Sequence, residues 1–253
     1  MKKIAVDLGS RFIKIAVLKE EGYDFYKEST VEFYKKYIRR GNKGVYIDLD
    51  DLGIDTKNAS IVSTGYGRYL MNFVNAETIS EIKAHFFGAK VQTAENNFTL
   101  VDIGGQDSKV IQARDGYIND FSMNDKCAAS TGRFVEQAAR ILDIPVEEFI
   151  QTSDSPAKLS DTCAIFCESE LIGLLAQGEK VERLASGVNL SVARRMAPQL
   201  IRYKSDKVFA AGGVAASKAI LGFLTELTRL DITPLPIPQY NGAIGGLNLP
   251  AKF

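Results

Sequence analysis

The stretch LVDIGGQDSKVIQARDG at residues 100–116 repeats the pattern of IAVDLGSRFIKIAVLKEEG at residues 4–22. In both copies a short apolar run leads into Asp-x-Gly, a tight turn, a Lys seven residues after the Asp, and a second run typical of a β-strand. The matched residues are Asp7, Gly9 and Lys14 in the first copy and Asp102, Gly104 and Lys109 in the second. Chance turns do not also repeat the spacing of Asp and Lys, so one supersecondary unit is predicted to occur twice.

Each copy has the chemistry of a polyphosphate site. A turn with Gly9 and Ser10, or with Gly104 and Gly105, can take φ > 0 and point successive backbone N–H groups at an anion. A carboxylate at the strand end can hold a hydrated Mg²⁺. A single match of this kind is more often an ordinary hairpin turn. Two copies in one chain favour a nucleotide that is bound by both hairpins.

The composition is that of a globular chain without charge imbalance. Of 253 residues, 45% are hydrophobic, and 31 basic side chains balance 31 acidic ones. Zero net charge gives no electrostatic sign of a nucleic-acid partner or an anionic membrane. No apolar stretch approaches the roughly 18 residues of a membrane span, and the N-terminal residues are typical of a strand rather than a signal sequence. We therefore expect a cytoplasmic protein whose three cysteines are thiols or metal ligands.

Hydrophobic periodicity predicts alternating strands and helices. Strands are expected at 3–8, 12–19, 23–33, 45–49, 60–64, 98–103, 108–113, 117–122, 207–211 and 232–237. Helices are expected near 66–73, 77–88, 131–142, 145–151, 164–177, 180–202 and 217–230, with a short final helix from 241. The polar segment near 89–97 divides the chain into a lobe at 1–95 and a lobe at 96–253, whose final helix can return to the first lobe. A ligand is expected in a cleft between the lobes.

A third glycine-containing segment, VFAAGGVAA at 208–216, is also a candidate for binding the nucleotide. An apolar strand that ends in Gly212 and Gly213 before a helix lets the backbone approach a flat ligand closely, so a nucleoside fits there. An ordinary strand-to-helix turn explains the segment equally well.

Several of these segments together resemble a known family. The paired hairpins and the Gly-Gly turn are similar to the superfamily of acetate kinase, sugar kinases, Hsp70 and actin. Within it, the chain resembles the activator ATPases of 2-hydroxyacyl-CoA dehydratases, a family that includes the ATPase subunits of benzoyl-CoA reductases. The resemblance rests on STGYGR (63–68), VDIGGQDSKVI (101–111), MNDKCAASTGRF (123–134), TCAIFCESE (162–170), AGGVA (211–215) and QYNGAIGG (239–246).

This resemblance implies a fold, an activity and partners. The fold is α/β, a two-lobed duplicated ribonuclease H-like (actin-like ATPase) fold with an interlobe nucleotide cleft. The activity is ATP hydrolysis coupled to low-potential single-electron transfer, which activates a 2-hydroxyacyl-CoA dehydratase or a related acyl-CoA reductase. The cofactors are ATP or ADP, Mg²⁺ and one [4Fe-4S] cluster per homodimer, and ferredoxin or flavodoxin is the electron source.

The resemblance also places two cysteines at the cluster. The family's cluster positions fall on Cys127 and Cys163. Because a [4Fe-4S] cluster usually needs four thiolates, two per chain require a two-fold dimer. Each Cys precedes a predicted helix, which Ser130 or Thr131 can cap in the first case and Asp161 or Thr162 in the second.

The remaining site residues follow from the turns and the resemblance together. Asp7 and Asp102 are expected to position Mg²⁺ and water, and the turns with Lys14 to hold phosphates, through Gly9, Ser10, Arg11, Gly104, Gly105 and Gln106. The Gln106 carboxamide can orient the attacking water or only stabilise its hairpin. Gly212, Gly213 and Gln239 are expected at the nucleoside.

Some residues leave other interpretations open. Cys167, where relatives carry a small residue, is interpreted as core packing or a neighbour of the cluster rather than a ligand. Zinc binding by Cys163 and Cys167 with His85 is a weaker rival. His85 is more often a packed residue than a base. Ser130 stands where the family motif has Gly, and is strained if that position takes φ > 0.

Two functions without redox chemistry remain as alternatives. One is a sugar or carboxylate kinase of the same superfamily, with Asp50, Asp51 or Asp107 as base. The other is an actin-like polymer or regulatory ATPase. Neither uses a pair of cysteines before helices.

Overall fold

The computed structural model describes residues 2–41, 44–47, 49–69, 76–160 and 164–249. Contacts within the chain divide it into two compact units. Unit 1 comprises Met1–Glu95 and Gln239–Phe253, and unit 2 comprises Asn96–Pro238. Within the described ranges, no helix has the length and apolar character that crossing a membrane requires.

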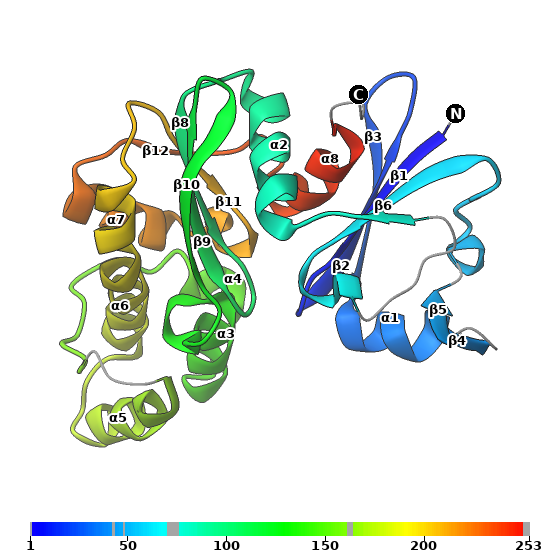
Figure 1. The fold of residues 1–253 in the computed structure, drawn as a ribbon. Coiled ribbons are helices and arrows are strands. Elements are labelled where there is room, and N and C mark those ends of the chain that lie inside the picture. Colours follow the sequence, from blue (N-terminus) through cyan, green and yellow to red (C-terminus); the bar gives the residue numbers. More distant parts are fainter. Residues whose placement is uncertain (1, 42–43, 48, 70–75, 161–163, 250–253) are drawn as a thin grey trace. The chain divides into compact units, whose positions relative to one another are not determined.

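Unit 1 is built on a five-stranded sheet with the order β3-β2-β1-β6-β7 (Figure 1). Strands β1, β2 and β3 form antiparallel hairpins, whereas β6 and β7 continue the sheet in parallel. The strands are β1 Lys2–Leu8, β2 Phe12–Leu18, β3 Tyr23–Ser29, β6 Ala59–Thr64 and β7 Ala76–Thr78. The helices are α1 Thr30–Tyr37, α2 Glu81–Thr93 and α8 Asn241–Leu247, and a small ribbon pairs β4 Ile38–Gly41 with β5 Gly44–Ile47.

The two faces of the first sheet have different cores because alternate residues of a strand point to opposite faces. One face buries the larger residues Ile4, Val6 and Leu8 of β1 together with Phe33 of α1. The other face carries Ala5 of β1 and contacts α2 and α8. By alternation Asp7 lies on this second face, where small residues let α8 approach closely.

Unit 2 repeats the same sheet. Its strand order is β10-β9-β8-β11-β12, again with antiparallel hairpins followed by parallel strands. The strands are β8 Phe98–Ile103, β9 Ser108–Arg114, β10 Tyr117–Asn124, β11 Val208–Ala211 and β12 Ile232–Pro234. The helices are α3 Gly132–Ile141, α4 Val146–Phe149, α5 Ala164–Ala176, α6 Val181–Arg202 and α7 Lys218–Thr228. The predicted α/β fold with a duplicated mixed sheet is therefore confirmed.

Two predicted elements of unit 1 are wrong in part. The strand expected at 23–33 ends at Ser29, and α1 begins at Thr30. Thr30 donates from its N–H to the Arg11 carbonyl and from its hydroxyl to the Gly9 carbonyl, so a contact with the preceding hairpin ends the strand. The helix expected at 77–88 begins only at Glu81, because 76–78 pair with β6 as strand β7.

Other boundaries differ less. Of the helix expected at 66–73, Tyr66–Tyr69 form a short 3-10 helix, and the rest lies outside the described residues. The strand expected at 232–237 ends at Pro234. The final helix α8 contacts α2 and β1 in unit 1, so the chain returns to its first sheet.

Candidate functional site

An acidic residue and a lysine face each other at the same place in both sheets. Asp7 of β1 is paired with Lys14 of β2, and Asp102 of β8 with Lys109 of β9. The Lys14 Nζ lies 3.6 Å from the Asp7 Oδ2, and the Lys109 Nζ lies 3.2 Å from the Asp102 Oδ2. Both carboxylates are almost fully buried. The compensating ammonium groups reduce the cost of burying these charges.

The two lysines differ in their surroundings. Lys109, which the sequence did not single out as a site residue, is fully buried. Its Nζ also lies 2.8 Å from the Asp107 Oδ2, so two carboxylates share one ammonium. The Lys14 side chain is 18% exposed and pairs with Asp7. Unit 1 thus leaves its lysine more accessible to a ligand, and Asp107 is engaged in an ion pair rather than available as a kinase base.

The other two acidic residues considered for a kinase are surface groups. Asp50 is exposed, and hydrogen bonds from the backbone and then the side chain of Thr56 hold the pKa of its carboxyl below the ordinary value. Asp51 forms an ion pair with Arg39. The lowered pKa of Asp50 is the opposite of what a base that must exchange protons near neutral pH needs, and the Asp51 carboxylate is occupied by Arg39.

Each buried Asp also lies against a glycine from the neighbouring parallel strand. Gly65 follows β6 with φ +91°, and Gly212 follows β11 with φ +83°. A Cβ on Gly65 would lie 2.6 Å from the Asp7 Oδ1, and a Cβ on Gly212 would lie 2.6 Å from the Asp102 Oδ1. Gly212 was predicted as a site residue, but Gly65 was not. The signal was present, because STG after one predicted strand matches AAG after the other.

The positive φ expected for the two glycine-containing turns is wrong. Gly9, Gly104 and Gly105 do not have positive φ. The glycines are needed for space instead, since a Cβ on Gly9 would lie 2.6 Å from the Phe12 carbonyl oxygen, and one on Gly104 would lie 2.7 Å from the Asp107 Oδ1. These turns are therefore tight in packing rather than left-handed.

The second turn is tied to the start of α3. The carbonyls of Gly104 and Gly105 accept hydrogen bonds from the N–H groups of Gly132 and Arg133, both at 2.9 Å. The Gly104 N–H itself donates a hydrogen bond to the Asp107 carbonyl oxygen. Gln106 lies in this turn and is half-buried. A displacement of the turn would therefore also move the first residues of α3, which are hydrogen-bonded to it.

Near the first turn, Ser10 is half-buried and Arg11 is exposed. Gln239 begins the segment that returns to unit 1, and its Oε1 accepts a 2.9 Å hydrogen bond from Lys27 Nζ. Lys27 was missed because it lies beyond the repeated motif. In unit 2, Gly213 starts the 3-10 helix Gly213–Ala216 directly after Gly212.

His85 is a packed residue that supports the Asp7 side of the site. It is buried on α2, and the Asn241 Nδ2 lies 3.2 Å from its Nδ1 and 2.9 Å from its carbonyl oxygen. A Cβ on Gly242 would lie 3.0 Å from the Asp7 Oδ2 and 3.3 Å from the His85 Nε2. The glycine at the start of α8 therefore leaves room for the carboxylate and the imidazole.

Cys127 is exposed at the loop between β10 and α3. Asn124 holds this loop, because its Oδ1 accepts from the Cys127 N–H at 3.1 Å and its Nδ2 donates to the Cys127 carbonyl at 2.9 Å. The same Nδ2 lies 2.7 Å from the Ser130 Oγ. Cys163, Asp161 and Thr162 lie outside the described residues.

The expected helix cap after Cys127 is wrong. Thr131 is the N-cap of α3 but its side chain makes no cap hydrogen bond, and its hydroxyl donates to the Ala128 carbonyl. Ser130 takes no positive φ, so the exchange of Gly for Ser does not strain the backbone. Its hydroxyl instead lies 3.3 Å from the Ser108 Oγ, at the start of β9.

Cys167 lies in the core of unit 2 and is 5% exposed. Burial, and next the nearby Glu170 charge, raises the pKa of its thiol to about 11. Metals and clusters bind the thiolate, so a thiol that stays protonated is a poor ligand. Among the residues that the structure describes, no group of three or more His, Cys, Asp and Glu side chains is arranged to hold a metal ion.

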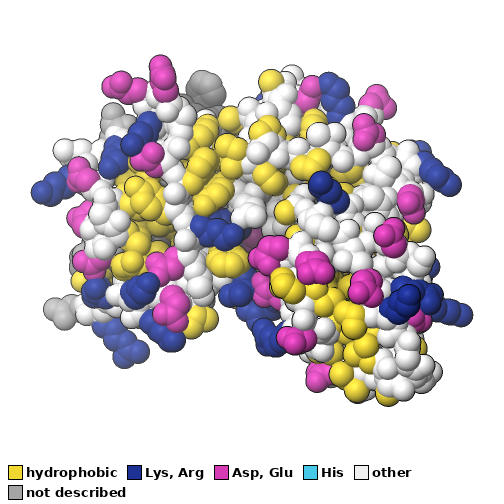
Figure 2. Space-filling view, turned by 180° about the vertical axis from the view of Figure 1, so that it is seen from behind, with side chains coloured by type: hydrophobic (Ala, Val, Ile, Leu, Met, Phe, Trp, Pro, Cys, Tyr) yellow, Lys and Arg dark blue, Asp and Glu magenta, His cyan; other side chains and the backbone are white. Residues whose placement is uncertain are grey.

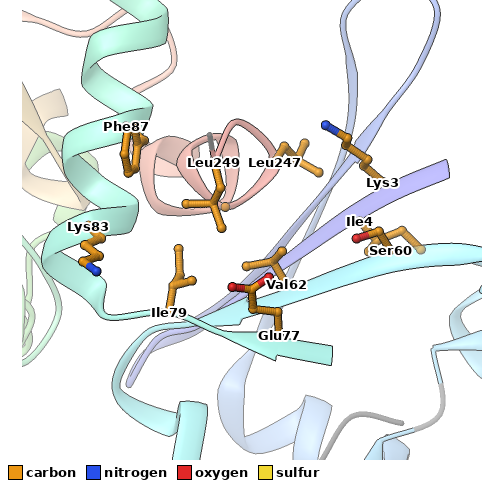
Figure 3. Close-up of a pocket in the computed structure, with 11 residues that line it drawn as sticks. Lys3, Ile4, Ser60, Val62, Glu77, Ile79, Lys83, Phe87, Leu247 and Leu249 are labelled. Atoms are coloured by element: carbon orange, nitrogen blue, oxygen red, sulfur yellow. The ribbon is translucent and has the colours of Figure 1, made fainter. Parts of the chain in front are cut away.

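Unit 1 also contains a cavity of about 370 Å³ (Figure 3). Its walls come from β1, β6, β7, α2 and α8, and they are mainly apolar, with Lys3, Lys83 and Glu77 at the edges. The residues described as lining it include none of the predicted site residues.

The chain is similar to known proteins over nearly its whole length. The sequence profile of the BadF/BadG/BcrA/BcrD ATPase family matches residues 4–249. The activator of lactoyl-CoA dehydratase from Anaerotignum propionicum is 37% identical over 258 residues, which cover 97% of this chain and 95% of the relative. The (R)-2-hydroxyglutaryl-CoA dehydratase activating ATPase from Acidaminococcus fermentans is 34% identical over 254 residues, which cover 96% of this chain and 94% of the relative.

A solved structure agrees with these relatives. The activator of the 2-hydroxyisocaproyl-CoA dehydratase from Clostridium difficile, solved with bound ADPNP, superposes with a TM-score of 0.83 at 30% sequence identity. The superposition covers 98% of this chain and 93% of that chain.

Proposed function

The chain belongs to the BadF/BadG/BcrA/BcrD ATPase family, and we propose that it hydrolyses ATP to activate a 2-hydroxyacyl-CoA dehydratase or a related acyl-CoA reductase. The resemblance predicted from the motifs is confirmed, and relatives that match this chain over nearly its whole length are named as such activators. The observation that carries the proposal is the duplicated group of a buried Asp, a facing Lys and a close glycine.

The donor sets support MgATP as the nucleotide. Carboxylate oxygens are the ligands that Mg²⁺ prefers, and Asp7 and Asp102 each bring a buried carboxylate to a strand end. When bound, Mg²⁺ neutralises charge on the phosphates. Lys14 and the turns Gly9–Arg11 and Gly104–Gln106 hold the phosphates, and Gln106 orients the attacking water. Gly212, Gly213 and Gln239 border the nucleoside.

Cys127 and Cys163 are proposed to hold the iron of a [4Fe-4S] cluster shared by two subunits. In support, the Cys127 thiol is exposed and its backbone is fixed by Asn124, whereas the Cys167 thiol is buried and kept protonated. When bound, the cluster supplies low-potential single-electron transfer to the dehydratase, and ferredoxin or flavodoxin restores the electron. Two cysteines per chain imply the homodimer.

The exposed apolar residues of α5 are suited to a protein partner. Helix α5 begins at Ala164, the residue that follows Cys163 in the sequence, and exposes Phe166 and Ile172. In Figure 2 hydrophobic side chains bordered by acidic ones lie at the lower end of unit 2, where Figure 1 places α5. An apolar centre with a polar rim is the usual composition of a protein interface. A second subunit and the dehydratase are the partners proposed for this region.

In unit 2, hydrogen bonds and a short stretch of backbone connect the second phosphate turn with Cys127. The carbonyls of the turn bind the first N–H groups of α3, and the loop before α3 is fixed by Asn124, which also holds Cys127. A phosphate that moves Gly104 and Gly105 therefore acts on the loop that carries the thiol. Coupling of this kind requires two arrangements of the loop that ATP and ADP populate differently.

The test is activation of a purified 2-hydroxyacyl-CoA dehydratase under anaerobic conditions. The reduced protein with MgATP should produce active dehydratase, and MgADP should not. Formation of a phosphorylated sugar or carboxylate in proportion to ADP would instead support the kinase. ATP hydrolysis without dehydratase activation, by protein that contains iron, would contradict the proposed function.

A further inference from the structure

A row of polar side chains crosses the sheet of unit 1. Lys27 of β3 is paired with Lys14 of β2, and Lys14 is paired in turn with Asp7 of β1. Directly paired residues on neighbouring strands lie on the same face of the sheet. The Lys14 ammonium group pairs with the Asp7 carboxylate, and Lys27 is the next cation along this row.

Unit 2 lacks this second cation. There β10 pairs Met123 with Lys109, and Lys109 is paired with Asp102. The two sheets have the same strand order, so Met123 occupies the position of Lys27. The duplicated units differ at this point by one positive charge.

The position of Lys27 is electrostatically unfavourable in the protein alone. Like charges directly opposite each other on neighbouring strands destabilise a sheet. Lys27 is exposed, and partial desolvation, followed by the charges of Lys14 and Arg11, lowers the pKa of its ammonium group. Two of these cations contact the Phe12 ring, because Lys27 Nζ lies 4.3 Å and Arg11 Cζ 4.9 Å from its centroid. A bound anion would relieve this repulsion.

Gln239 fixes the direction of the Lys27 ammonium group. Its Oε1 accepts a hydrogen bond from Lys27 Nζ at 2.9 Å. An ammonium group carries three N–H donors, so Lys27 can bind Gln239 and a phosphate oxygen together.

We propose that Lys27 binds the terminal phosphate of ATP and so makes unit 1 distinguish ATP from ADP. The inference rests on the proposed ATPase function and adds a residue to it. ATP carries one more negatively charged phosphate than ADP. The row in unit 1 carries one more positive charge than its counterpart in unit 2, and that charge is Lys27.

The test compares binding of two nucleotides by calorimetric titration in the presence of Mg²⁺. Lys27→Met, which copies Met123 of unit 2, should weaken binding of the ATP analogue ADPNP by about tenfold, the usual scale for a charge-assisted hydrogen bond, and that of ADP by less than about threefold. Lys27→Arg should keep most of the preference. The control is Lys35→Met, because Lys35 is an exposed residue of α1 that pairs with Glu32.

The outcomes separate this inference from the proposed function. Equal loss of affinity for ADPNP and ADP, or an unchanged ratio, would overturn the role of Lys27 while leaving the ATPase intact. Wild-type protein that binds neither nucleotide would overturn both. Circular dichroism checks that each variant is folded. If Lys27→Met does not fold, Lys27→Gln, which can still donate to Gln239, replaces it.

Discussion

A Cβ atom on Gly65 would lie 2.6 Å from the Oδ1 of Asp7, so the end of β6 leaves room for the carboxylate only because residue 65 has no side chain. Unit 2 repeats the relationship with Gly212 and Asp102. Both glycines also have positive φ, where other residues are strained.

Substitution of these glycines should damage the site more than the fold. Gly65→Ala and Gly212→Ala combine backbone strain with a contact on the carboxylate, and we expect a loss of about 2 to 4 kcal/mol of stability and most ATPase activity. Gly53→Ala is the control, because Gly53 has φ +74° but no atom within 4 Å of the added Cβ. Urea unfolding and ATP hydrolysis measure the two effects. If Gly53→Ala lost as much activity, strain alone would explain the result.

Removal of the buried carboxylates should abolish hydrolysis. Asp7→Ala and Asp102→Ala each leave the phosphates without a proposed Mg²⁺ ligand, and we expect turnover to fall by at least about a hundredfold. The control is Asp24→Ala, which removes an exposed ion pair with Lys19. Turnover within about twofold of wild type in both variants would make Asp7 and Asp102 structural.

The cysteines should differ in their effect on iron. Anaerobic protein is expected to be a brown dimer with about four irons per dimer, and Cys127→Ser and Cys163→Ser should each remove the colour. Cys167→Ala, a change in the core of unit 2, should keep it. A folded, colourless monomer after iron reconstitution would contradict the cluster, and loss of colour in Cys167→Ala would make that residue a ligand.

Asn124 should be needed for nucleotide control of the iron. Asn124→Ala frees the Cys127 loop, so the difference between ATP and ADP in the rate of iron capture by bathophenanthroline should decrease. Asn119→Ala is the control on the same strand, because Asn119 donates to Gln112 rather than to the loop. Identical capture with ATP, ADP and neither in the wild type would leave the iron without coupling to the nucleotide.

The buried thiol should make the protein less stable at high pH. The pKa of Cys167 is about 11 in the folded protein, against an ordinary value of 9.0. The contribution of the protonated thiol to the free energy of unfolding is therefore complete below about pH 9 and is lost as the pH rises toward 11. In iron-free protein, the loss of unfolding free energy between pH 8 and pH 10 should be smaller for Cys167→Ala than for wild type. Equal losses would mean that the thiol ionises alike in both states.

The sequence alone determined the features that depend on neighbours along the chain. The repeat around Asp7 and Asp102 predicted both hairpins and their matching positions, because a strand, a tight turn and a returning strand are encoded within a few residues. The registers Asp7 with Lys14 and Asp102 with Lys109 follow from that turn length. The motifs also identified the family.

Tertiary structure decided the features that join distant segments. Gly65 reaches Asp7 only because β6 pairs in parallel with β1, and Lys27 joins the row because β3 pairs with β2 in one particular register. Helix α1 replaces the last residues of a predicted strand because Thr30 binds the first turn. Local propensity is weak compared with such contacts. Parallel pairing and register are set by the burial of whole faces, which a pattern of neighbouring residues does not specify.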